Sequence, residues 1–200
     1  MKNIFVVTLL VSLLSVSLKE ETYVIDKKAC KVHWLAKKTA GQHEGDVYLQ
    51  SGILLMNGKI PVSGKFILDM SSVTVSDIAD PNDNADLVNH LKRDDFFGTE
   101  KFPTAKLVIT KFEKIEKAES DMPNYTATAH LTIKDSTNEI KFPARIDSNG
   151  NLVNASADIT IDRTQWNIVY KSKTIFSTLG DKFIYDDINF GVKLVLQQQR

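Results

Sequence analysis

From residue 22 onward, hydrophobic positions alternate with polar ones along much of the chain. In the clearest run, every second residue from Ile188 to Leu196 is apolar. A period of two is typical of a β-strand with one buried face, because successive side chains point to opposite sides of the sheet. Similar runs cover residues 30–37, 62–70, 105–110, 126–133 and 154–162, and turn-forming residues stand at 57–58, 135–136, 148–151 and 179–181. The pattern predicts eight or nine antiparallel strands.

One segment departs from this period. Asp80 and Pro81 open a stretch rich in helix-capping residues, and apolar residues from Leu87 to Leu91 follow at helical spacing. We therefore expect a short helix over about residues 84–93 in an otherwise all-β chain. No Pro-, Gly- or Ser-rich linker divides the chain, so it reads as one domain. Strands at regular spacing favour a barrel or a sandwich, and an eight-stranded barrel can hold one small ligand.

The first residues have the pattern of a secretory signal peptide. A lysine precedes an apolar run over residues 4–14, and small serines stand at the −3 and −1 positions of a cut before Leu18. The run is shorter than the roughly 20 apolar residues that a membrane-spanning helix needs. We expect a cleaved signal peptide over residues 1–17, a mature domain over residues 18–200 and no stable membrane span.

Charge and cysteine content exclude several classes of protein. The 25 basic and 25 acidic residues cancel, so no overall field attracts nucleic acid, and we expect no nucleic-acid partner. The single cysteine, Cys30, excludes an intramolecular disulfide and a cysteine-based zinc cluster. An exported chain without disulfides is typical of the bacterial periplasm or exterior, so we expect a periplasmic or secreted protein.

The chemistry of the chain gives little support to catalysis. The histidines at 33, 43, 90 and 130 lack the close spacing of a metal motif, so we expect no metal site. The chain has no G-x-S-x-G, H-E-x-x-H or phosphate-loop motif. We expect a protein that is not an enzyme, with no catalytic residues and no cofactor. A His–Asp–Ser constellation assembled from distant segments stays open.

Several short motifs resemble those of the YceI-like family. The most specific is HLKRDDFF at residues 90–97, followed by Phe102-Pro103. The others are HEG at residues 43–45, the strand at 62–70 that contains GKF and ends in an acidic residue, and HLTIKD at residues 130–135. In this order and spacing they cover essentially the whole mature chain. The chain departs from the family at residues 29–30 and 87–88, where it carries apolar or small residues in place of polar pairs.

The resemblance implies a lipocalin-like, extended antiparallel β-barrel of about eight strands with one short inserted helix. It further implies an apolar interior that binds a long-chain isoprenoid lipid of polyprenyl or quinone type. Each buried CH₂ contributes about 0.8 kcal/mol, so an apolar tube needs no charged anchor. The candidate cavity residues are Trp34, Phe66, His90, Leu91, Phe96, Phe97, Leu107, Ile109, Leu131, Ile133 and Phe190.

Alternation identifies the inward face of a barrel but does not distinguish a hollow barrel from a filled one. Our hypothesis is an exported, non-enzymatic protein that holds or carries the lipid. One alternative is an exported hydrolase or isomerase acting on such a lipid, with His90 and a nearby aspartate as acid and base. Another is a solid barrel that binds a partner through its surface. Whether the chain forms a homodimer stays open.

Overall fold

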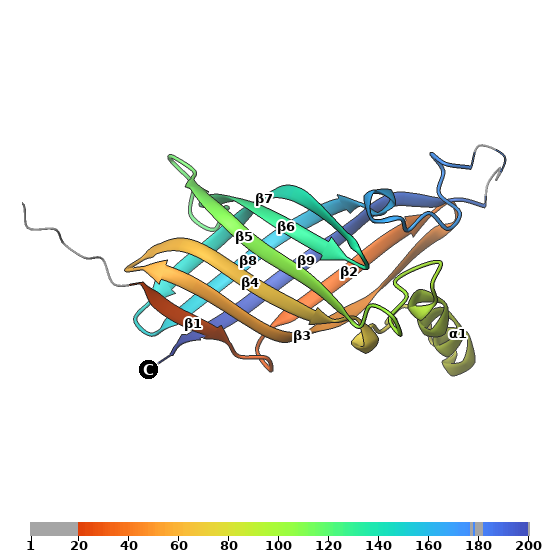
Figure 1. Ribbon diagram of the computed structural model, residues 1–200, viewed down its shortest axis with the longest axis horizontal. Helices are drawn as coiled ribbons and strands as arrows, with labels where there is room; N and C mark the ends of the chain where they lie inside the picture. The colour runs from red at the N-terminus through yellow and green to blue at the C-terminus, as the bar shows by residue number, and fades with distance from the viewer. Residues whose placement is uncertain (1–19, 177, 179–181, 200) are drawn as a thin grey trace, which may run out of the picture.

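The computed structural model describes residues 20–176, 178 and 182–199 (Figure 1). The signal peptide expected over residues 1–17 and the turn expected at 179–181 lie outside these ranges. The described chain forms one long antiparallel β-barrel, with one helix and the connection before the last strand gathered at the same end (Figure 1).

Over the residues that the structure describes, the fold has nine strands, one α-helix and two short 3₁₀-helices. The strands are β1 (Glu21–Ile25), β2 (Lys31–Lys38), β3 (Gly41–Asn57), β4 (Ile60–Asp69), β5 (Thr104–Lys114), β6 (Tyr125–Ile133), β7 (Ser136–Asn149), β8 (Leu152–Asp162) and β9 (Ile184–Gln198). The helices are η1 (Met70–Ser72), α1 (Pro81–Lys92) and η2 (Arg163–Trp166). Neighbouring strands follow the order β1-β3-β2-β9-β8-β7-β6-β5-β4, and β4 pairs back with β3 to close the sheet. The expected lipocalin-like barrel is confirmed.

Strands β1 and β2 together occupy one position in the barrel. β2 lies between the first half of β3 and β9, where Trp34 faces Gly45 on one side and Phe190 on the other. β1 lies between the second half of β3 and the last residues of β9, where Val24 faces Ile53 and Gln197. Nine strands therefore close a barrel with eight positions, in agreement with the prediction of eight or nine strands.

The two ends of the barrel differ. At the end with the β3–β4 and β7–β8 turns, which we call the hairpin end, Tyr23, Met56, Val153 and Leu196 pack together with no more than 2% of their surface exposed. At the other end, which we call the capped end, α1 and the connection between β8 and β9 cover the opening (Figure 1). The hairpin end is closed by tight core packing, whereas two separate segments lie over the capped end.

Helix α1 begins earlier than the sequence predicted. Asp80 caps it by accepting hydrogen bonds from the backbone N–H groups of Asn82 and Asp83, and Pro81 takes the first helical position, where its missing N–H costs nothing. Leu91, in the last turn, is the only residue of the helix that is buried. Among the described residues, no helix is long and apolar enough to span a bilayer.

Candidate functional site

The barrel is hollow. The cavity inside it has a volume of about 160 Å³. Since a water molecule takes up about 30 Å³ in the liquid, the hollow has room for several atoms of a ligand. Strands β2 to β9 all contribute inward-facing side chains to the wall, and only Ser156 and Arg163 among the wall residues are polar or charged in type. The cavity is therefore shaped to hold an apolar molecule.

Most of the sequence-predicted site residues lie on this wall. Ten of the eleven line the cavity: Trp34, Phe66, Leu91, Phe96, Phe97, Leu107, Ile109, Leu131, Ile133 and Phe190. Three of these, Leu107, Leu131 and Phe190, point inward and are still only half-buried. We attribute their remaining exposure to the hollow that they face. That these residues contact a ligand stays a prediction.

His90 lies at the capped end but is not one of the wall residues. Its ring contacts those of Phe96 and Tyr170 edge-on, at centroid distances of 5.0 and 4.7 Å. Its Nε2 lies 3.1 Å from a carboxylate oxygen of Asp95. Because Tyr170 belongs to the β8–β9 connection, this aromatic cluster joins α1 to the second segment that covers the capped end.

Phe96 and Phe97 both face the cavity, although they are neighbours in the chain. Neighbouring residues of an extended segment would point to opposite sides. Residues 93–98 instead form tight turns, in which Phe96 N–H and Gly98 N–H both donate to the Arg93 carbonyl oxygen. The turns place both rings on the wall beneath α1.

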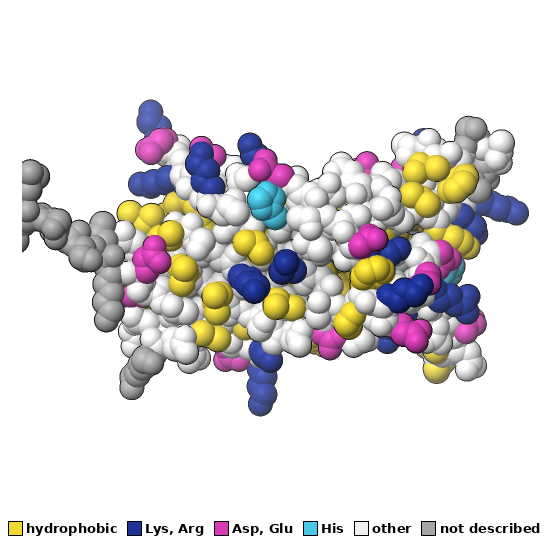
Figure 2. Space-filling model, viewed as in Figure 1, with side chains coloured by type: hydrophobic (Ala, Val, Ile, Leu, Met, Phe, Trp, Pro, Cys, Tyr) yellow, Lys and Arg dark blue, Asp and Glu magenta, His cyan; other side chains and the backbone are white. Residues whose placement is uncertain are grey.

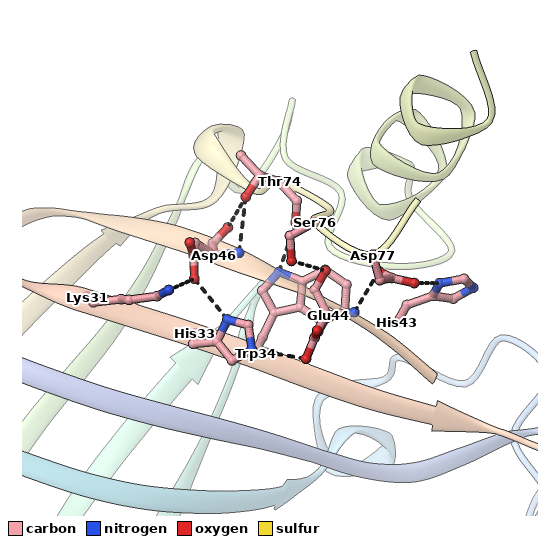
Figure 3. Close-up of polar contacts among 9 residues, drawn as sticks. All are labelled: Lys31, His33, Trp34, His43, Glu44, Asp46, Thr74, Ser76 and Asp77. Carbon is pink, nitrogen blue, oxygen red and sulfur yellow. Dashed lines mark hydrogen bonds and ion pairs between the residues drawn. The ribbon is translucent and has the colours of Figure 1, made fainter. Parts of the chain in front are cut away.

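The segment over residues 73–77, which we call the strap, extends the barrel wall beside the first residues of β3 (Figure 3). Thr74 N–H donates to the Asp46 carbonyl oxygen at 2.9 Å, and the indole N–H of Trp34 donates to the Thr74 carbonyl oxygen at 3.1 Å. Gly45 allows this close approach, because a Cβ there would overlap the Thr74 carbonyl oxygen. The strap thereby places Val73 on the cavity wall and leads directly into α1.

A carboxylate and a histidine hold the far end of the strap (Figure 3). Asp77 accepts hydrogen bonds from the Glu44 backbone N–H at 3.0 Å and from His43 Nδ1 at 2.8 Å. Lys38 Nζ lies 2.8 Å from His43 Nε2, an arrangement that leaves the ring proton on Nδ1. Burial alone would raise the pKa of Asp77, but the hydrogen bonds outweigh it and hold that pKa below its usual value.

A second polar group lies nearby on β2 and β3. His33 Nδ1 is 2.9 Å from Asp46 and its Nε2 is 3.4 Å from Glu44, while Lys31 is 3.4 Å from Asp46 (Figure 3). Within residues 20–176, 178 and 182–199, no three His, Cys, Asp or Glu side chains are arranged to hold a metal ion. These contacts join strands rather than form a metal centre.

Arg163 is a buried charge at the edge of the cavity, and no pattern in the sequence indicates its burial. Its guanidinium donates to the carbonyl oxygens of Ile168 (2.7 Å), Ile184 (3.2 Å) and Tyr185 (3.2 Å). Its Nη2 also lies 3.3 Å from the carboxylate of Asp186. Burial lowers the pKa of Arg163, and the neighbouring Asp186 partly offsets that effect. Arg163 fastens the β8–β9 connection to the start of β9.

Comparison with solved structures finds the same fold in several bacterial proteins. BcnA of Burkholderia cenocepacia is 19% identical and superposes with a TM-score of 0.65 over 86% of this chain and 98% of its own. A polyisoprenoid binding domain from Saccharophagus degradans, implicated in plant cell wall breakdown, is 13% identical, with a TM-score of 0.58 over 88% and 98%. The YCEI protein of Campylobacter jejuni is 19% identical, with a TM-score of 0.53 over 100% and 99%.

At these identities the solved structures establish a shared fold. A search of the curated proteins gives no match. A family model for the YceI-like domain, however, matches residues 23–196, which is nearly the whole described barrel. The match includes the HLKRDDFF and HLTIKD motifs noted in the sequence. The chain therefore belongs to the YceI-like domain family.

Proposed function

We propose that this protein holds the tail of a long-chain isoprenoid lipid, of polyprenyl or quinone type, inside its barrel. The almost wholly apolar hollow inside the barrel is the observation that carries the proposal. The structural similarity to the Saccharophagus degradans polyisoprenoid binding domain supports the same class of ligand. Family membership supports it too.

The energetics of such a site need no polar anchor. Each CH₂ moved from water into the cavity contributes about 0.8 kcal/mol, so a few isoprene units offset the several kcal/mol that binding costs in lost motion. The half-buried wall residues would complete their burial against the tail. Affinity would therefore rise with tail length until the hollow is full.

We propose a carrier or store rather than an enzyme. Ser156 is the one hydroxyl-bearing residue on the wall, and no hydrogen bond joins it to a histidine in the part of the chain that the structure describes. His90 is paired with Asp95 outside the wall, which does not favour the acid–base alternative. The signal-peptide pattern of residues 1–17 supports a periplasmic or secreted carrier.

Native mass spectrometry of the protein from its own envelope, with lipid analysis of the organic extract, tests the proposal. We expect a stoichiometric adduct that extracts as a polyprenyl or quinone-like species. A clean apo mass that stays unchanged after incubation with long-chain isoprenoids would overturn the proposal and favour the solid-barrel alternative.

Variants on one strand assign the binding to the cavity. Leu131 faces the hollow, whereas its neighbour His130 faces outward and is exposed. Leu131→Asp should abolish the adduct, because it places an unpaired carboxylate in the apolar cavity, while His130→Asp should keep it. Because Leu131→Asp also costs stability, Ala157→Phe serves as a second variant that fills the hollow without adding charge. If folded Leu131→Asp protein kept full lipid occupancy, position 131 would not line the binding site.

A further inference from the structure

The connection between β8 and β9, together with the first residues of β9, presents apolar side chains to solvent beside lysines. Ile175, Phe176 and Tyr185 keep 51%, 44% and 42% of their surface exposed, although they are large and apolar. Figure 2 shows apolar side chains gathered over this part of the capped end, at the upper right, next to basic side chains. Lys171 and Lys173 belong to the same short segment and are exposed. We call these five residues the tip.

Internal hydrogen bonds hold the tip in this exposed arrangement. Ser172 is fully buried, its carbonyl oxygen accepts from Phe176 N–H at 3.1 Å, and its hydroxyl accepts from Ile175 N–H at 3.3 Å. The Thr174 hydroxyl donates to Asp186 at 2.7 Å, and Asp186 is in turn paired with the buried Arg163. The turn therefore presents Ile175 and Phe176 outward, although burying them would be favourable.

The lysines of the tip lie against aromatic rings. Lys173 Nζ is 4.8 Å from the centroid of Phe183 and 5.8 Å from that of Tyr185, and Lys171 Nζ is 5.3 Å from that of Tyr170. Within the described residues, neither lysine lies within ion-pair distance of a carboxylate, and Asp186 is already held by Arg163. Positive charge thus accompanies the exposed apolar groups even though the whole chain is neutral.

We infer that the tip docks onto the surface of a bilayer containing anionic phospholipids. Apolar and aromatic side chains flanked by lysines fit the boundary between headgroups and acyl chains, where the rings enter the apolar layer and the ammonium groups contact lipid phosphates. The position of the tip agrees with this role. Ile184, which follows the connection, lines the cavity, and Tyr170, which precedes the tip, contacts His90 and Phe96.

This inference rests on the proposed function, because it takes the hollow to be filled from a membrane. The hairpin end also exposes apolar residues, among them Ile60 at 60%. That end offers no route to the hollow, because Tyr23, Met56, Val153 and Leu196 fill it. Docking at the capped end would bring α1, of which only Leu91 is buried, to the membrane surface together with the tip.

Flotation with vesicles tests the docking. The probes are vesicles of phosphatidylcholine alone and vesicles with phosphatidylglycerol added, at low and high salt. The wild-type protein should float with the anionic vesicles, and less so at high salt. Ile175→Ser/Phe176→Ser should weaken this binding about tenfold or more, because two apolar side chains no longer enter the bilayer. Ile60→Ser is the matched control at the hairpin end and should bind as the wild type does.

A second variant and a second readout keep the two proposals separable. Lys171→Gln/Lys173→Gln should lose the preference for anionic vesicles. Its thermal stability should fall only slightly, since both side chains are exposed and the contact of an exposed lysine with an aromatic ring is weak. Both double variants should still bind an isoprenoid delivered in detergent, whereas a failure of the proposed function would abolish that binding in the wild type as well.

Three results would overturn the docking. In the first, wild-type protein does not float with either kind of vesicle. In the second, the Ser double variant binds as the wild type does. In the third, the wild type is a dimer in solution and the Ser double variant is a monomer, which would make the tip a contact between two copies of the chain.

Discussion

Replacing Arg163 tests how the capped end is fastened to the barrel. Arg163→Met removes hydrogen bonds to three backbone carbonyl oxygens and leaves Asp186, whose side chain is 11% exposed, without its cation. Breaking a buried ion pair from one side costs about 3–5 kcal/mol. Against a total free energy of unfolding of roughly 5–15 kcal/mol, this is a large loss. At about 2–4 °C per kcal/mol for a domain of this size, the Tm should fall by roughly 6–20 °C.

The assay is thermal and urea denaturation of the purified variant, with two comparisons. Arg145→Met removes a more exposed arginine that pairs with Asp147, and should cost at most about 1 kcal/mol. Adding Asp186→Asn to Arg163→Met should recover part of the loss, because the uncompensated charge is gone. If Arg163→Met unfolded within about 1 kcal/mol of the wild type, the buried pair would not be what holds the capped end, and the reasoning would be refuted.

Two further predictions concern the strap. Gly45→Ala should displace the strap, because the added methyl group overlaps the Thr74 carbonyl oxygen. We expect the free energy of unfolding to fall by about 1–3 kcal/mol and amide exchange over residues 73–77 to become faster. Gly191→Ala is the control: its methyl group meets no atom closer than 3.8 Å, so stability should change by less than about 0.5 kcal/mol. Equal exchange in the two variants would refute this. Because the folded-state pKa of Asp77 is lowered, its ionised form stabilises the protein above the usual carboxyl pKa, and this contribution is lost as the pH falls through the folded-state value. Asp77→Asn should therefore be less stable than the wild type at neutral pH in urea denaturation, and the difference should shrink below about pH 4; a difference independent of pH would contradict this.

The alternation of apolar and polar residues was enough to predict a β-barrel or sandwich and many of the residues that line the cavity. Ala105, Leu107 and Ile109 follow a strict period of two in β5, and the structure places all three on the cavity. The same holds from Ile188 to Leu196 in β9. The period of the hydrophobic residues and the face of the strand on which they lie are set by neighbouring residues, so they can be predicted from the sequence alone.

Other residues reach the cavity wall through register shifts or through contacts between distant segments, which a local sequence pattern does not predict. Phe112 lies among lysines and glutamates that read as a solvated strand, but the register shifts between Ile109 and Lys111, and Phe112 lines the cavity. Arg163 directly follows a strand, a position typical of an exposed arginine, and its burial depends on pairing with Asp186, which is distant in the sequence. Whether the barrel is hollow depends on its circumference and on the sum of all inward side-chain volumes, which no one segment determines.

The split position shared by β1 and β2 has a consequence for the order in which the chain can fold. Both segments pair with β9, so the first and last strands of the chain complete the barrel together, as when Tyr23 meets Gln198. A chain that emerges from its N-terminus therefore leaves β1 and β2 with an unpaired edge until the final residues arrive. The barrel therefore cannot close around its hollow until β9 is available to pair with β1 and β2.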